Sequence, residues 1–288
     1  MPGYFHISTD GRSSSVLFRD PTEFVAGMNR IYFALTVTNL VLLAFCLMDN
    51  HVHFVLYGEE DQCWIFIHRY KQLTGKWLQH HSGEVRSLDA MVPDVKPIPD
   101  QDYLMNVIIY DIMNPTKAFM PFIPTGYRWS SAGLYFADNS LLPLDHKKAG
   151  DFSEAQKRRL FGTKVSVPEG FLIGPDGMIW PGCYTDYAFV ERLFGKPMTM
   201  IDRMTKSVEY QINMDMAEGK LSLPDAELLQ KAKGLARQIF GAKSIGDLDV
   251  DQRISLARRL KITTKASYKQ ISRVVQMRYS DILTVFRQ

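Results

Sequence analysis

The sequence has few cysteines, no long apolar run and almost no net charge, and each shortage argues against a class of protein. Its three cysteines, Cys46, Cys63 and Cys183, form no CxxC pair, which argues against a disulfide framework or a zinc knuckle. The longest apolar run, residues 32–48, is interrupted by polar residues and falls short of the ~20 residues that a membrane span needs. No basic segment followed by an apolar one opens the sequence. We therefore expect a cytoplasmic protein with no membrane partner.

The small net charge hides a strongly basic C-terminal segment. The whole chain has a net charge of +3, whereas residues 253–288 contain nine basic residues and one acid, so nine minus one gives +8 there. Residues 267–275 and 279–287 read as two helices around a short turn, the pattern of a helix-turn-helix whose second helix enters a major groove. A basic packing module is the alternative, and Gln276 stands where such turns often carry glycine.

Within this segment the residue types suggest two kinds of DNA contact. Side chains early in the second helix would reach base edges, and basic side chains before and in the first helix would hold phosphates. The candidate groove contacts are Arg278, Tyr279, Ser280 and Thr284, and the candidate phosphate contacts are Lys265, Lys269 and Arg273.

The first 113 residues predict an α+β fold with the element order β-α-β-β-α-β-α. Asp20 and Pro21 suit the start of the first helix, as its cap and its first position. This order matches a ferredoxin-like antiparallel sheet with packed helices. The predicted elements are strands 4–8, 40–48, 52–57 and 90–98, the last an edge strand, and helices from 20, 59–81 and 100–113. We expect an α+β domain over 1–140, a connecting segment over 141–183, and a helical DNA-binding domain over 184–288 with its helix-turn-helix at about 253–288.

Two short motifs suggest chemistry. His51 and His53 lie two apart at a predicted strand, so their side chains point to the same face and could bind a metal ion. Tyr110 and Asn114 are four apart and share a face of the helix that would pack beside them. Two histidines and an amide oxygen could hold a divalent ion that polarises a phosphate for attack by the tyrosine. Hydrogen-bonded histidines and a half-buried tyrosine are the alternative interpretation.

Three blocks of sequence together resemble a known family. They are Asn50-His51-Val52-His53, then Tyr110 through Asn114-Pro115, then Trp129-Ser130-Ser131. This order is similar to that of the REP-associated tyrosine transposases, members of the single-tyrosine, His-hydrophobic-His endonucleases, and it covers roughly residues 1–140. The sequence departs from the family in Asp49, which replaces a proline, in Asp111 beside the tyrosine, and in Lys117, which stands for a basic residue usually found soon after the Asn-Pro pair.

The resemblance implies a transposase-like enzyme that cuts and rejoins single-stranded or hairpin DNA. His51, His53 and Asn114 would bind Mg²⁺ or Mn²⁺, and Tyr110 would attack a phosphate to give a 5′-phosphotyrosine linkage and a free 3′-hydroxyl. The C-terminal domain would grip duplex or hairpin DNA, and the protein would act as a monomer or a homodimer.

Two other readings remain open on the sequence alone. One is a catalytically inactive, domesticated transposase that regulates by binding DNA, and the other is a metal-binding domain unrelated to DNA.

Of three further residues, Arg12 and Trp129 have two interpretations each and His6 has one. Arg12 could touch a DNA phosphate or be a solvated charge in a turn. His6 is a strand residue that lies near the site at most. Trp129 fits a core position better than a stacking platform for bases, although single strands do stack on aromatic side chains.

Overall fold

The structure is a computed structural model, and it divides the chain into two compact units. Residues 1–9, 17–82, 88, 91–118, 120, 122–138, 145–217, 225–264, 266 and 268–287 are described. The first unit is Met1–Met204 and the second is Thr205–Gln288. None of the described helices is both long and apolar enough to cross a membrane.

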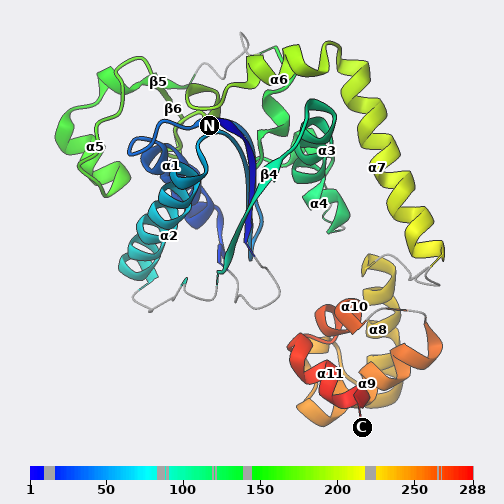
Figure 1. Ribbon diagram of the computed structural model, residues 1–288. Helices are drawn as coiled ribbons and strands as arrows, with labels where there is room; N and C mark the ends of the chain where they lie inside the picture. The colour runs from blue at the N-terminus through cyan, green and yellow to red at the C-terminus, as the bar shows by residue number, and fades with distance from the viewer. Residues whose placement is uncertain are drawn as a thin grey trace. The chain divides into compact units, whose positions relative to one another are not determined.

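A four-stranded antiparallel sheet forms the centre of the first unit (Figure 1). Its strands are β1 (Gly3–Thr9), β2 (Val41–Leu47), β3 (Val52–Gly58) and β4 (Pro93–Ile98), in the spatial order β2-β3-β1-β4. The predicted element order is confirmed, and β4 is an edge strand as its prolines predict, because proline cannot donate a ladder hydrogen bond.

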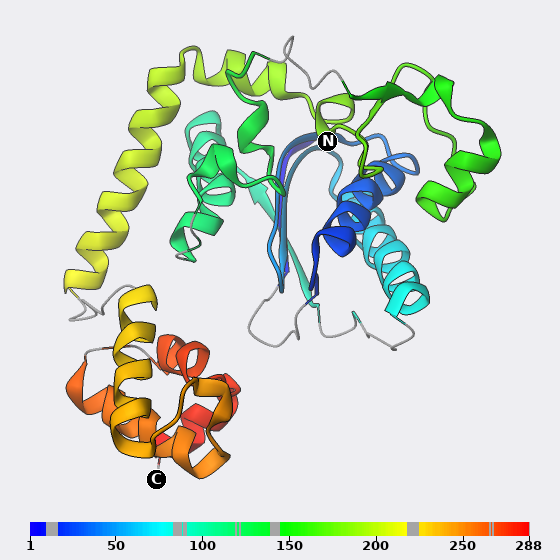
Figure 2. The same ribbon diagram turned by 180° about the vertical axis from the view of Figure 1, so that it is seen from behind.

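One face of the sheet is covered by α1 (Pro21–Leu35) and α2 (Glu60–Ser82), as Figures 1 and 2 show. The Asp20 side chain accepts a hydrogen bond from the Glu23 amide at 3.0 Å, and Pro21 is the first helical residue, so the predicted helix start is confirmed. Phe5, Ile7 and Phe54 point to this face and join the largest apolar cluster. This face is therefore the main core of the first unit.

The opposite face is covered by α3 (Gln101–Ile112), which is followed at once by the short α4 (Asn114–Lys117). Asp100 caps α3 by accepting from the Tyr103 amide at 2.8 Å. The segment after α4 contains the short 3-10 turns η1 (Pro124–Gly126) and η2 (Ser131–Leu134) and runs along the edge of β2. There the Leu47 amide donates to the Trp129 carbonyl at 2.8 Å.

The rest of the first unit folds back onto α1 and β2. It contains the 3-10 turns η4 (Ala149–Asp151) and η5 (Pro181–Cys183), the helices α5 (Glu154–Phe161) and α6 (Tyr187–Phe194), and the strand pair β5 (Lys147–Lys148) and β6 (Leu172–Ile173). The buried Asn29 amide of α1 donates to the Gly177 carbonyl at 3.0 Å and accepts from the Ile179 amide at 2.8 Å. The Asp186 amide donates to Leu42 of β2 at 2.8 Å. These contacts hold α6 within the first unit, Met1–Met204.

The second unit is helical. Beyond α7 (Pro197–Ala217), which crosses the boundary, it has α8 (Asp225–Phe240), the 3-10 turn η6 (Ile245–Asp247), α9 (Val250–Thr263), α10 (Tyr268–Val274) and α11 (Tyr279–Arg287). Ile271, Val275 and Ile282 are fully buried in its core. Gln276, in the turn between α10 and α11, has φ 57°, the left-handed conformation that glycine adopts at lower cost.

Candidate metal centre

Strand alternation gathers two histidines on the face that α3 covers. Phe5 and Ile7 point to the main core, so His6, which lies between them on β1, points the other way. In the antiparallel register Ser8 pairs with His53, and His6 pairs with Val55 two positions along. His6 and His53 are therefore diagonal neighbours on one face, a separation that long and aromatic side chains bridge.

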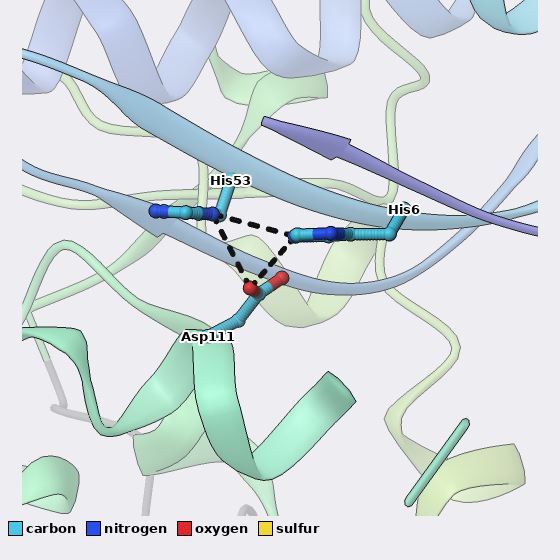
Figure 3. A group of neighbouring side chains, drawn as sticks. All are labelled: His6, His53 and Asp111. Carbon is cyan, nitrogen blue, oxygen red and sulfur yellow. Dashed lines mark hydrogen bonds and ion pairs between the residues drawn. The ribbon is translucent and has the colours of Figure 1, made fainter. Parts of the chain in front are cut away.

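Asp111 of α3 completes a compact group with these histidines. Its side chain is 0% exposed. Its Oδ1 lies 3.0 Å from His6 Nε2 and 3.4 Å from His53 Nδ1, and these two nitrogens are 3.3 Å apart. The imidazole rings are stacked, with centroids 5.5 Å apart and planes inclined by 5°. Figure 3 shows the carboxylate of Asp111 directed at both rings.

Burial and the Asp111 carboxylate shift the pKa values of the two histidines in opposite directions. Burial lowers the pKa of His53 to about 4, and the nearby Asp111 charge only partly opposes this. Burial also lowers the pKa of His6, but the attraction of Asp111 and its hydrogen bond outweigh burial, so the pKa of His6 is raised. At neutral pH, His53 is therefore a neutral ring with a nitrogen lone pair to offer.

These three residues could hold a metal ion. Their donor atoms lie within 4.8 Å of one another. Three donors on one ion at about 2.1 Å, at angles between octahedral and tetrahedral, would be about 3.0–3.4 Å apart. The observed separations of 3.0, 3.3 and 3.4 Å fall in that range. In the described part of the chain, His53 Nε2 and Asp111 Oδ2 are buried without a hydrogen-bond partner. Each of these atoms therefore has a lone pair that could coordinate a metal ion.

Tyr110 lies beside this group. Its ring stands edge-on to His53, with centroids 5.8 Å apart, and to His6, at 6.3 Å. The residue is 44% exposed, so a ligand can reach it from solvent. The ammonium of Lys117 lies 4.5 Å from the centre of the Tyr110 ring, a cation–π distance. The structure thus brings together Tyr110, Lys117 and His53, as expected of a shared site.

His51 and Asn114 border the group without belonging to it. The His51 ring is perpendicular to that of His53, with centroids 5.0 Å apart, and its Nδ1 lies 2.6 Å from Asn50 Oδ1. The Asn114 amide donates to the carbonyls of Tyr110 at 3.0 Å and Asp111 at 3.3 Å. The predicted ligands His51, His53 and Asn114 therefore differ from the clustered donors of the structure, which share only His53 with them.

Sequence reasoning gave His6 and Asp111 too small a role. The sequence places His6 near the site at most, and it marks Asp111 only as a departure from the family pattern beside the tyrosine. The structure turns the Asp111 carboxylate inward, where it contacts both histidines. A signal existed in the sequence, because Asp111 follows Leu104, Val107 and Ile108 on the helical spacing of the buried face. A buried acid needs a partner.

The other predicted DNA contacts either belong to the second unit or fall outside the described residues. Arg12 and Lys265 are outside the described residues, and Lys269 lies in α10 with its side chain undescribed. In the second unit Arg273, Arg278, Ser280 and Thr284 are exposed and Tyr279 is partly exposed. The Ser280 hydroxyl donates to Asp281 at 3.2 Å, and that of Thr284 donates to the Ser280 carbonyl at 3.1 Å.

Comparison with known proteins adds little. No family model matches the chain. No curated protein matches it either. Among solved structures, the chain is similar to a REP-associated tyrosine transposase bound to a REP hairpin, with 12% sequence identity and a TM-score of 0.35, over 59% of this chain and 90% of that one.

Proposed function

We propose that the chain is a metal-dependent endonuclease and strand transferase of single-stranded DNA, with Tyr110 as its nucleophile. One observation carries the proposal. A half-exposed tyrosine stands edge-on to His53, whose buried Nε2 could bind a metal ion, and a lysine ammonium lies 4.5 Å from the tyrosine ring. The sheet order β2-β3-β1-β4 with helices after β1, β3 and β4 supports a ferredoxin-like fold for this domain.

In this proposal the ion binds His53 through Nε2, together with His51 and Asn114. Two observations support coordination through His53 Nε2 over the His6–His53–Asp111 donors. His53 Nε2 is buried without a partner, which a bound ion would correct. The other nitrogen of the ring already faces Asp111, and a metal-bound histidine usually donates that N–H to a carboxylate. Asp111 and His6 then hold the His53 ring in place and do not touch the ion.

The chemistry divides among these residues. A bound Mg²⁺ or Mn²⁺ would polarise the scissile phosphate and neutralise its charge. The Tyr110 oxygen forms a bond to phosphorus and loses its proton. The bond from phosphorus to the 3′ oxygen breaks, and that oxygen leaves as a 3′-hydroxyl. Lys117 supplies a positive charge beside the Tyr110 ring, which favours the phenolate. The reverse reaction with another 3′-hydroxyl rejoins strands, so no nucleotide cofactor is needed.

The second unit would hold duplex or hairpin DNA. We propose that α10 and α11 form a helix-turn-helix, supported by two short helices, a turn of residues 275–278 and a buried face containing Ile271, Val275 and Ile282. The exposed Arg273 and Arg278 would meet phosphates or base edges. Binding should then weaken steeply with salt, which a domain unrelated to DNA would not show.

The test is covalent capture of DNA. The wild-type chain is incubated with labelled single-stranded hairpins taken from the flanks of its own gene, with Mn²⁺, and resolved on a denaturing gel. We expect a protein–DNA adduct that requires the metal and is absent in Tyr110→Phe. Tyr103→Phe is the matched control, because Tyr103 is an exposed tyrosine on the same helix, and it should leave the adduct intact.

The other outcome also assigns a function. Equal DNA binding by wild type and Tyr110→Phe, without adduct on any hairpin, would refute the enzyme. It would favour a catalytically inactive relative that regulates by binding DNA.

A further inference from the structure

A cavity of about 530 Å³ opens on the first unit beside the turn between β2 and β3. Its volume lies in the range of small-ligand sites. It is lined by the segment before α1, by the start of α1, by Asp49 of the turn, and by residues after α4. None of the chemistry assigned to Tyr110 or His53 uses it.

Aromatic rings form most of its wall, and one of them is exposed. Phe24 is stacked on Trp129, with centroids 4.9 Å apart and planes inclined by 13°, and the Arg128 guanidinium lies 5.0 Å from the Trp129 ring. Trp129 is thus already in contact with two groups. Phe122 is 46% exposed and has Tyr127 beside it at 5.7 Å. Phe122 is therefore the ring that still offers a stacking surface.

Two charged residues also line the cavity. The guanidinium of Arg19 can donate hydrogen bonds, and the carboxylate of Asp49 can accept them. A flat ring beside a guanidinium and a carboxylate matches a nucleobase, which has a π-face and an edge of donors and acceptors.

Two stretches of chain link this cavity in sequence to the proposed cutting site. The Met48 amide donates to the His51 carbonyl at 2.8 Å, which closes the turn, and Asp49 within this turn lines the cavity. The backbone of Asp49 is fixed by the Phe18 amide, which donates to its carbonyl at 2.9 Å. On the other wall, Phe122 follows α4, and Asn114 begins α4. Residues that line the cavity thus lie within a few positions in sequence of His51 and of the end of α4.

We propose that this cavity binds one unstacked nucleobase of the DNA strand, with Phe122 stacking on its face and Arg19 and Asp49 contacting its edge. This inference rests on the proposed function, because only a single-stranded substrate presents free bases there. A base held in the cavity would fix the position of the strand while a neighbouring phosphate lies at Tyr110.

The experiment compares two labelled 12-mers of equal charge, oligo-dT and a fully abasic strand, binding to the full-length protein in EDTA. Fluorescence anisotropy gives both dissociation constants, and their ratio cancels phosphate contacts. Stacking of one base predicts about tenfold tighter binding of oligo-dT. Phe122→Ala should bring the ratio below about twofold. Ile123→Ala is the matched control, since Ile123 is 71% exposed, adjacent and outside the lining, and it should keep the wild-type ratio.

A second variant and a second measurement distinguish loss of the base site from misfolding of the variant. Phe122→Leu keeps an apolar side chain but removes the ring, so it should lose the preference while melting like wild type. Oligo-dT should also change the tryptophan fluorescence, and this change should vanish in Trp129→Phe but persist in Trp180→Phe, because only Trp129 lines the cavity.

Two results would overturn the base site. One is equal affinity of wild type for both strands, and the other is an unchanged ratio in Phe122→Ala. Neither result depends on adduct formation. Failure of the Tyr110 adduct with an intact base preference would therefore remove the proposed enzyme and leave this site.

Discussion

Replacing Asp111 with asparagine tests the role of the buried carboxylate. Asn keeps the size of the side chain but removes a charge that is 0% exposed and lies 3.0 and 3.4 Å from two imidazole nitrogens. If Asp111 orients His53 through Nδ1, the loss should weaken Mn²⁺ binding by about 10- to 100-fold, or about 1.4–2.7 kcal/mol. Mn²⁺ titration followed by EPR at pH 7 measures this directly.

The same variant has a readout that needs no metal. Asp111 is what raises the pKa of His6 against the effect of burial, so the pKa of His6 should fall in Asp111→Asn. NMR titration of the histidine ring protons in the metal-free protein follows this change. Asp102→Asn, an exposed acid on the same helix, should alter neither quantity. Mn²⁺ affinity within twofold of wild type, or an unmoved His6 midpoint, would refute the positioning role.

Further predictions concern the ligand set, pH and DNA. His51→Ala should weaken Mn²⁺ binding more than about 100-fold and His6→Ala less than about tenfold; the opposite ranking would assign the ion to His6, His53 and Asp111. Because burial lowers the pKa of His53 to about 4, the unfolded chain binds a proton that the folded one excludes between about pH 6.5 and 4. The free energy of unfolding should therefore fall by up to roughly 3 kcal/mol as pH falls through this window. Urea melts should show that the free energy of unfolding differs less between pH 7 and pH 4.5 in His53→Gln than in wild type. Arg278→Ala should reduce the slope of log affinity against log salt by about one, whereas Lys231→Ala on α8 should not, and equal slopes would remove Arg278 from the interface.

The element order was predictable because local signals mark most boundaries. Asp20 and Asp100 cap their helices, and the prolines of β4 place that strand at the edge. The extent of the first unit was not predictable in this way. Its later part is joined to α1 and β2 by contacts distant in sequence, such as Asn29 with Gly177, which no local pattern reports.

The site was half predictable for a similar reason. His53, Tyr110 and Lys117 come from motifs within single elements, and the structure brings them together. His6 depends on the register between β1 and β3, in which it is a diagonal neighbour of His53. Register is set by pairing across the sheet, so a motif search along the chain does not find such a residue.

Asp111 and His6 nevertheless leave a joint signature in the sequence. An acid on the apolar spacing of α3 must be paired, because an isolated buried carboxylate is costly. A partner must come from the polar positions of the strands that this helix covers. On β1 the alternation of Phe5 and Ile7 leaves His6 facing α3, and on β3 the same face shows His53. The need to pair one buried acid with polar partners therefore selects these two histidines without reference to any ion. Whatever the chain does with metal and DNA, this pairing fixes the orientation of the ring beside Tyr110.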